Sequence, residues 1–248
     1  MNKYLVIIPV YNEENALQAI TKEIKNTTTI VDILVVDDGS TDDTFEVIKS
    51  MENIAYIRHI NNKGYGKTLI DGFRFAIRKG YDSVITIDSD KQHQPREINL
   101  FIQANNTIDA DIISGSRYLN VSHKKIASAP PDRLKINRKI TEQINKMTGF
   151  QLTDAFCGFK LYKVSALNKL NLTEYGYGMP LQLWIQAWKQ KLTVREVPVA
   201  LIYFDQKPYQ TSSWSNMFSR YKYYLQTIQK EIKSYDAFIH RIPQNTNS

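Results

Sequence analysis

Short apolar runs alternate with segments of helical periodicity from the amino terminus to Gly115. Tyr4 to Val10 is a continuous β-rich run, the pattern of a strand that is buried on both faces of a parallel sheet. Between the runs, apolar residues return at the spacing of an amphipathic helix. Further runs of strand type lie at 33–36, 54–57, 83–87 and 112–113. The alternation predicts an α/β fold with a doubly wound, mostly parallel (mixed) sheet flanked by helices.

The pattern becomes irregular after Gly115. Residues 116–131 show no clear period, so we predict a long loop, and loops of this length are usually functional or mobile. We divide the chain into a main domain, residues 1–208, and a C-terminal basic helical extension, residues 209–248. The remaining expected elements are a helix over 132–147, a short strand over 159–162, a helix over 181–188, an edge strand or hairpin over 194–203 and a long helix over 214–242.

Two helix starts carry capping signals. Asn12 precedes a helix whose first turn contains Glu13 and Glu14, so we expect its side chain to cap that helix. Ser40 is followed three residues later by Asp43, which resembles a capping box at the start of the next helix.

The chain is basic, with a net charge of +7 and a pI near 9.2, which indicates an anionic partner such as phosphate groups, a membrane surface or nucleic acid. No stretch resembles a nucleic-acid-binding motif, so we expect no nucleic-acid partner. The single cysteine, Cys157, excludes an internal disulfide and fits a reducing compartment. The N-terminus lacks a secretory pattern, and no apolar run approaches the roughly 18 residues that a membrane span needs. We expect a cytoplasmic protein that is at most peripheral to the inner face of the cell membrane.

Two carboxylates follow the apolar run at 83–87. Asp88 and Asp90 come at the carboxyl end of the predicted strand, where open α/β sheets bind their ligands. Their hard oxygens, with that of Gln92, suit Mg²⁺ or Mn²⁺, ions that keep several waters and bind substrate phosphates. A polar turn that caps the next helix, with Pro95 in its first turn, explains the same residues without a metal.

Groups suited to a nucleotide follow two other strands. Tyr11 offers a ring on which a base can stack, and Asp38 offers an acceptor for a ring N–H. These strand ends should meet the carboxylate pair in one crevice at the edge of the sheet. The loop 64–67 adds close backbone approach and the cation of Lys67 for phosphate groups, although a simple strand-to-helix turn explains the same glycines.

In their order along the chain, these motifs resemble those of family-2 glycosyltransferases with the GT-A fold, and most closely the dolichyl-phosphate mannose synthase-like branch. The resemblance runs from about Lys3 to about Tyr203 and rests on Pro-Val-Tyr-Asn-Glu-Glu, Val-Val-Asp-Asp-Gly-Ser-Thr-Asp, Lys-Gly-Tyr-Gly and Asp-Ser-Asp-Lys-Gln-His. It implies a metal-dependent, inverting transfer of a sugar from a nucleotide diphosphate donor. At matching positions it implies that the nucleoside is held by Pro9, Tyr11, Glu13, Val36 and Asp38, donor phosphate or ribose by Ser89, and Mg²⁺ or Mn²⁺ by Asp88, Asp90 and Gln92.

Two arginines are candidates for binding phosphate groups. The family's Gly-Ser-Arg-Tyr motif falls on residues 115–118 and so marks Arg117, and a later Arg and Ser of the family fall on Arg133 and Asn137. A guanidinium presents a rigid fork of donors that matches phosphate oxygens. Two of them near a metal-bound diphosphate can clamp a second phosphate or stabilise the leaving one.

The acceptor decides whether the reaction needs a general base. A phosphate monoester is already anionic at neutral pH and needs none, whereas a sugar hydroxyl requires a carboxylate that removes its proton. Asp154 is our candidate for that base; the alternative is that it caps or braces its loop. The chain departs from the family pattern at 157–160, 179–184 and 205–213, which leaves the acceptor open between a polyprenyl phosphate and a glycan hydroxyl.

The basic surplus concentrates in the expected C-terminal helix, which carries Arg220, Lys222, Lys230 and Lys233 among tyrosines. Such a stripe can lie on an anionic bilayer with the tyrosine rings at the level of the headgroups. A solvated helix that packs one face on the domain explains the same residues.

Two rival functions use the same kind of crevice. A nucleotidyltransferase is expected to show a Gly-rich, Arg/Lys-bearing phosphate loop directly after the first strand, and residues 9–13 lack one. A catalytically silent nucleotide-sugar-binding protein would keep the fold, but the intact set of Asp88, Asp90 and Gln92 argues against it.

Overall fold

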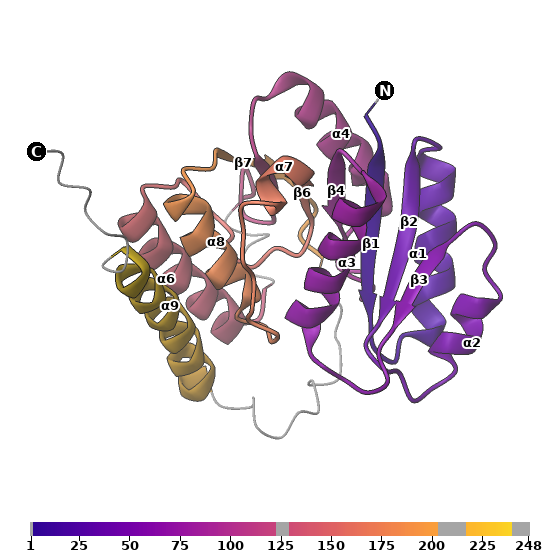
Figure 1. The fold of residues 1–248 in the computed structure, drawn as a ribbon, viewed down its shortest axis with the longest axis horizontal. Coiled ribbons are helices and arrows are strands. Elements are labelled where there is room, and N and C mark those ends of the chain that lie inside the picture. Colours follow the sequence, from indigo (N-terminus) through magenta and orange to yellow (C-terminus); the bar gives the residue numbers. More distant parts are fainter. Residues whose placement is uncertain (1, 123–128, 203–216, 240–248) are drawn as a thin grey trace, which may run out of the picture.

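One mixed sheet organises the protein, whose computed structural model describes residues 2–122, 129–202 and 217–239. Within these residues the strand order is β3-β2-β1-β4-β6-β5-β7 (Figure 1). β1 pairs in parallel with β2 and β4, β2 with β3 and β5 with β7, whereas β6 runs antiparallel to β4 and β5. The mostly parallel, mixed sheet predicted from the sequence is therefore confirmed. Its strands are β1 (Tyr4–Val10), β2 (Val31–Asp37), β3 (Ala55–Arg58), β4 (Ser83–Thr86), β5 (Ile112–Ser116), β6 (Lys160–Lys163) and β7 (Val194–Pro198).

The sheet is buried on both faces because the side chains of β1 alternate between two apolar cores. Leu5 and Ile7 belong to one core, whereas Val6 and Ile8 belong to the other. The first core is covered by α3 (Tyr65–Lys79), α6 (Pro131–Thr148), α7 (Val164–Leu167), α8 (Met179–Lys189) and α9 (Met217–Ile239). The second is covered by α1 (Glu14–Thr27), α2 (Thr44–Lys49) and α4 (Ile98–Thr107), which follows the 3₁₀ turn η1 (Pro95–Glu97).

The two capping predictions are wrong, because the polar side chains tie two loops together instead. Asn12 has a left-handed backbone, with φ of 57°, and its Oδ1 accepts a hydrogen bond of 2.9 Å from the Thr41 N–H. The Asn12 N–H in turn donates to Ser40 Oγ at 3.0 Å. Neither α1 nor α2 has a side-chain cap. The loops that follow β1 and β2 are thereby cross-linked at the edge where the site lies.

The C-terminal helix α9 packs against α8 and α6 on one side of the molecule, away from β1 to β3 (Figure 1). Its Tyr224 and Ile228 are buried in the same apolar core as α8. One face of α9 therefore packs on the domain, while Lys222, Lys230 and Lys233 are exposed. The boundary expected after residue 208, and the departures from the family pattern at 205–213, lie outside the described residues.

The edge strand expected over 194–203 is present as β7, which pairs in parallel with β5 at the end of the sheet. A hairpin is not formed there within the described residues, because β5 is the partner of β7. The long loop predicted over 116–131 leads from the end of β5 to α6, and its residues 123–128 lie outside the described part of the chain.

Candidate active site

A cleft of about 540 Å³ opens at the carboxyl ends of β1, β2, β4 and β5. One side, which we call the acidic wall, carries Glu13, Asp38, Asp88 and Asp90 from the ends of the first three of these strands. The other side, the arginine wall, carries Arg117, Arg133 and Arg220 from the end of β5, from α6 and from α9. The sheet thus brings together the strand ends that the sequence predicted to meet. Other lining residues include Pro9, Tyr11, Asn62, Gly64, Tyr65, Ser89, Gln92, Ile136, Asn137, Phe156, Tyr177, Pro180 and Tyr224.

Asp88 is held in place by Tyr65, which also lines the cleft, and by the buried His93. The Tyr65 hydroxyl donates to Asp88 Oδ1 at 2.9 Å, and His93 Nε2 lies 3.5 Å from Oδ2. A Cβ on Gly158 would lie 2.0 Å from Asp88 Oδ2, so glycine is required for this approach. Burial opposes ionisation, but the contacts with His93 and Tyr65 outweigh it and hold the pKa of Asp88 below its ordinary value.

Asp90 lies beside Asp88 in the cleft. Burial and the neighbouring Asp88 carboxylate raise the pKa of Asp90 above its ordinary value. The Gln92 N–H donates to Asp90 Oδ1 at 3.0 Å, and both side chains line the cleft. A divalent cation would relieve this repulsion, so the two carboxylates and the Gln92 amide fit Mg²⁺ or Mn²⁺. These ions take further ligands from water and substrate phosphates, and no group of three His, Cys, Asp or Glu side chains in the described residues is arranged to hold a metal ion without them.

Four of the residues implied for the donor line the cleft near the end of β1. Tyr11 is 45% exposed and presents a ring, Pro9 lies beside it, and the Ser89 hydroxyl donates to the Pro9 carbonyl at 3.2 Å. Burial, together with the Asp90 carboxylate, raises the pKa of Glu13 to about 7. This wall therefore combines a stacking surface with a high density of acidic groups.

Two of the residues predicted for the donor do not present their side chains to the cleft. Val36 is fully buried in the apolar core of the sheet and does not line the cleft. Lys67 lies in α3, where its ammonium pairs with the Asp71 carboxylate one turn later, and it does not line the cleft either. A helix places residues four apart on one face, so Lys67 is held by its own helix rather than presented to a phosphate.

Asp38 lines the cleft but is only 3% exposed. Its Oδ2 accepts a hydrogen bond of 2.8 Å from the Gly64 N–H, and its Oδ1 accepts one of 2.9 Å from the Lys63 N–H. Oδ1 also lies 2.7 Å from Nδ1 of the buried His59. Asp38 therefore anchors the loop that leads into α3, in addition to facing the cleft.

Arg117 and Asp154 form a bidentate pair at the foot of the arginine wall. Arg117 Nε donates to Asp154 Oδ2 at 2.7 Å, and its terminal nitrogen donates to Oδ1 at 3.0 Å. Asn137 Nδ2 also donates to Oδ1, at 2.7 Å. Burial alone would raise the pKa of Asp154, but Arg117 and the hydrogen bonds from Arg117 and Asn137 lower it to about 2.

This geometry favours the bracing role of Asp154 over the role of general base. Asp154 is fully buried and does not line the cleft, and a carboxylate with so low a pKa is a weak base. What Asp154 does is hold the Arg117 guanidinium, whose side chain is 12% exposed, at the surface of the cleft. Of the two roles that the sequence left open for Asp154, the geometry favours the structural one.

Several lining residues were not identified from the sequence. Arg133 was expected here, but Arg220 and Tyr224 reach the same wall from α9. Their spacing of four residues on a basic helix is the signal that would have placed them on one face. Tyr177 stacks on Tyr65, with ring centroids 5.6 Å apart, and adds an aromatic surface between the walls.

Comparison with known proteins agrees with this geometry. Over 218 residues the chain is 30% identical to a UDP-N-acetylglucosamine–dolichyl-phosphate N-acetylglucosaminyltransferase of Methanococcus voltae, covering 81% of this chain and 86% of the relative. It is 29% identical to an undecaprenyl-phosphate mannosyltransferase of Micrococcus luteus, covering 81% of this chain and 84% of that relative.

The fold matches that of a glucosyl-3-phosphoglycerate synthase from Mycobacterium tuberculosis solved with UDP, with a TM-score of 0.72 at 18% identity over 93% of this chain and 80% of the other. The same enzyme has also been solved with Mn²⁺, UDP and phosphoglyceric acid, with a TM-score of 0.71 at 15% identity over 93% of this chain and 78% of that one. The predicted GT-A fold is confirmed.

Residues 5–170, well over half of the chain, match the family model for glycosyl transferase family 2. The predicted glycosyltransferase activity is therefore confirmed, and the alternative of a nucleotidyltransferase is set aside. The acidic wall, the arginine wall and this match lead to one conclusion: the chain belongs to glycosyl transferase family 2.

Proposed function

We propose that this glycosyltransferase moves a sugar, with inversion at the anomeric carbon, from a nucleotide diphosphate donor to a polyprenyl phosphate, in a reaction that depends on Mg²⁺ or Mn²⁺. The observation that carries the proposal is a single cleft with an acidic wall on one side and an arginine wall on the other. The names of the Methanococcus voltae and Micrococcus luteus relatives, a dolichyl-phosphate and an undecaprenyl-phosphate transferase, support the acceptor class.

The acidic wall is the part suited to the donor. Tyr11 offers a ring for the base and Asp38 an oxygen for a ring N–H. Asp88, Asp90 and Gln92 would hold the divalent ion. When bound, that ion supplies neutralisation of the charge that develops on the departing diphosphate. The Mn²⁺ and UDP found with the structurally similar synthase support a metal-bound donor here.

The arginine wall is the part suited to a phosphate acceptor. Arg133 is exposed on α6 and lines the cleft with Arg117 and Arg220, so guanidinium groups can pair with phosphate oxygens. Apolar residues of the same region, Ile136 and Phe156 among them, suit the start of an isoprenoid chain.

The chemistry follows from these placements. A phosphate oxygen of the acceptor forms a bond to the anomeric carbon while the bond from that carbon to the diphosphate breaks. The nucleoside diphosphate leaves with the electron pair, and no proton has to be removed from the acceptor. The described carboxylates that line the cleft all belong to the acidic wall, which supports an acceptor that is already anionic. Asp154 then serves by orienting Arg117.

A lipid acceptor favours contact of α9 with a membrane, one of the two roles that the sequence left open for this helix. Phe218 at the start of α9 is 70% exposed, and Lys222, four residues later, is also exposed, whereas Arg220 lines the cleft. No helix among the described residues is long and apolar enough to span a bilayer. Sedimentation with liposomes containing anionic lipid tests this contact, and the absence of binding at low salt would refute the proposed membrane contact of α9. The location at the inner face of the cell membrane stays a prediction.

A thermal-shift panel of UDP, GDP and dTDP sugars, with and without Mn²⁺, tests the donor half, because a ligand that binds the folded state raises the melting temperature. We expect one diphosphate to stabilise the protein in a metal-dependent way and Asp90→Ala to abolish the effect. The stabilising donor is then incubated with a short polyprenyl phosphate or with free glycans. Transfer to the polyprenyl phosphate supports the proposal. Transfer to a glycan hydroxyl alone would refute the proposed acceptor. The absence of both transfer and donor hydrolysis would indicate a catalytically silent binding protein.

A further inference from the structure

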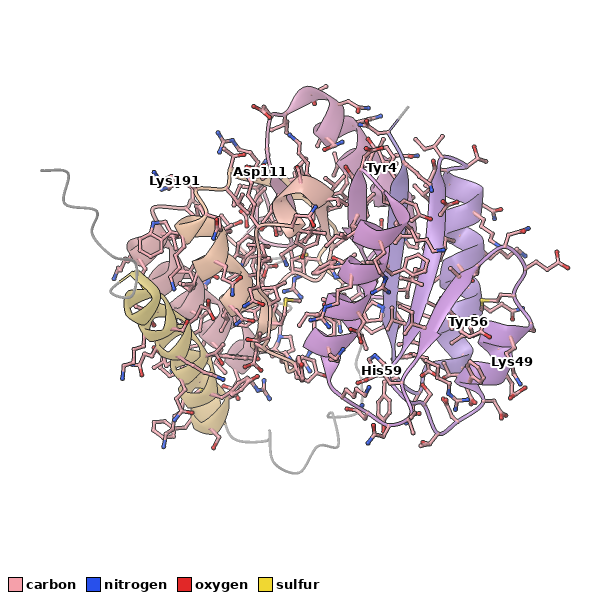
Figure 2. All side chains as sticks on the ribbon, viewed as in Figure 1. Tyr4, Lys49, Tyr56, His59, Asp111 and Lys191 are labelled. Atoms are coloured by element: carbon pink, nitrogen blue, oxygen red, sulfur yellow. The ribbon has the colours of Figure 1, made fainter. Side chains whose placement is uncertain are left out.

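His59 is a buried histidine whose two ring nitrogens both face carboxylates. It follows directly after β3 and is 4% exposed. Nδ1 lies 2.7 Å from Asp38 Oδ1, and Nε2 lies 3.0 Å from Asp71 Oδ2 in α3. Its backbone N–H donates to the Asp37 carbonyl at 2.8 Å, which fixes the residue to the sheet. Figure 2 labels His59 at the end of β3, where the chain turns toward α3.

Both contacts of the His59 ring are with carboxylates. An ionised carboxylate only accepts hydrogen bonds, so the contact with Asp38 requires a hydrogen on Nδ1. Asp71 also accepts a hydrogen bond from Lys67 and lies 3.5 Å from Arg74. Burial would raise the pKa of Asp71, but the hydrogen bonds from Lys67 and His59 hold it below its ordinary value. The buried pair of His59 and Asp38 thus continues into the half-buried pair of Asp71 and Lys67.

The His59 ring is placed where it can control the orientation of Asp38. The two oxygens of Asp38 also accept the Lys63 and Gly64 N–H groups, at 2.9 and 2.8 Å. Gly64 and Asn62 line the cleft, as Asp38 does, whereas His59 does not. A change at His59 would therefore reach the cleft through Asp38 and the loop 61–64.

We infer that His59 is a positioning residue for nucleotide recognition, whose Nδ1–H holds Asp38 and the loop 61–64 in the geometry that lines the acidic wall. This inference rests on the proposed function, because it takes the ligand of that wall to be a nucleoside diphosphate. It assigns His59 no contact with the substrate. It also gives a role to a partly buried polar cluster beside the cleft, because a buried ion pair is weak evidence for stability alone.

Two conservative variants separate the two contacts of the ring. The amide nitrogen of asparagine can take the place of Nδ1, and that of glutamine the place of Nε2. His59→Asn therefore keeps a donor for Asp38 and loses the one for Asp71, whereas His59→Gln does the reverse. In calorimetric titrations with UDP, GDP and dTDP in Mn²⁺, we expect His59→Gln to weaken binding about tenfold to hundredfold, the effect of losing a hydrogen bond to a charged group. His59→Asn should stay within about threefold of the wild type, because the donor for Asp38 remains. Equal affinities in the two variants, or a larger loss in His59→Asn, would overturn the inference.

Two measurements without nucleotide keep this result separate from the proposed function. Hydrogen exchange of the Lys63 and Gly64 amides should accelerate in His59→Gln and not in His59→Asn. In the wild type, ¹⁵N NMR of the His59 ring should show a hydrogen on Nδ1, and a ring without that hydrogen would overturn the inference even if both variants failed to fold. If the wild type bound none of the three nucleotides, the proposed function would fail. The amide exchange and the ring spectrum would still decide whether His59 holds Asp38.

Discussion

The pair of Arg117 and Asp154 gives the sharpest prediction about how the arginine wall is built. We consider a double-mutant cycle with Asp154→Asn, Arg117→Gln and the double variant. Each single change removes one partner of a bidentate contact whose two N–H···O distances are 2.7 and 3.0 Å. Asp154 is fully buried, so each single variant leaves a polar or charged group without its partner.

The expected loss in the free energy of unfolding follows from the pKa of Asp154. A fall from 3.8 to about 2 corresponds to roughly 2 kcal/mol in the free energy of unfolding. Asn137 and the Phe156 N–H contribute part of this, at 2.7 and 3.2 Å from Oδ1. Breaking a buried pair by removing one partner costs about 3 to 5 kcal/mol, and we expect about 3 because Arg117 is partly exposed. The double variant should lose about 4 kcal/mol, so the coupling energy is about 2 kcal/mol.

Urea unfolding of the four proteins measures this coupling. The matched control is Asp109→Asn, which removes the exposed ion pair with Lys163 at 3.1 Å and should leave the unfolding midpoint unchanged within error. A coupling energy below about 0.5 kcal/mol would refute the bracing role of Asp154. So would a variant Asp154→Asn that keeps full stability but loses turnover completely, because that is the behaviour of a general base.

Three further predictions concern the acidic wall and the effect of pH. Gly158→Ala should weaken Mn²⁺-dependent nucleotide binding by about tenfold or more, the effect of one misplaced metal ligand, because the added Cβ would lie 2.0 Å from Asp88 Oδ2. Calorimetric titration measures the affinity, and an unchanged affinity would contradict the placement of Asp88. Tyr65→Phe keeps the ring stacked on Tyr177 but removes the hydroxyl 2.9 Å from Asp88 Oδ1, so the same titration should show about a threefold to tenfold loss. The pKa of Asp154 is lower in the folded protein than its ordinary value, so its stabilisation is complete above pH 3.8 and is lost as the pH falls through about 2. Asp154→Asn should therefore flatten the acid limb of the unfolding free energy, and an unchanged limb would count against the low pKa.

The sheet and the acidic wall were predictable because their signals are local. Strands such as β1 and β2 are short apolar runs, and the residues directly after a parallel strand lie at one edge of the sheet. Tyr11, Asp38 and Asp90 therefore appear in the cleft where their positions in the sequence placed them. Alternation along β2 explains why the side chain of Val36 does not line the cleft: Val36 lies on the same face as Leu34, and both pack into the apolar core.

The other differences from the prediction have one local cause and several long-range ones. Lys67 has Asp71 four residues later, so its pairing could have been predicted from helical spacing alone. The contact of His59 with Asp38, by contrast, depends on how β2 and β3 pair, and the contact of Arg117 with Asp154 depends on how β5 and the loop between α6 and β6 are placed. Arg220 reaches the cleft only because α9 packs against α6 and α8. Tertiary packing, and not local pattern, sets these roles.

The central claim is that a divalent ion joins the carboxylates of the acidic wall to the diphosphate of a sugar donor. Diffraction from a crystal soaked with a nucleoside diphosphate and Mn²⁺, recorded at the manganese absorption edge, tests it most directly. The account predicts one anomalous peak beside Asp88, Asp90 and Gln92, with the diphosphate against it and the base near Tyr11. A nucleotide bound elsewhere, or one bound in the cleft with no manganese at these three residues, would contradict it.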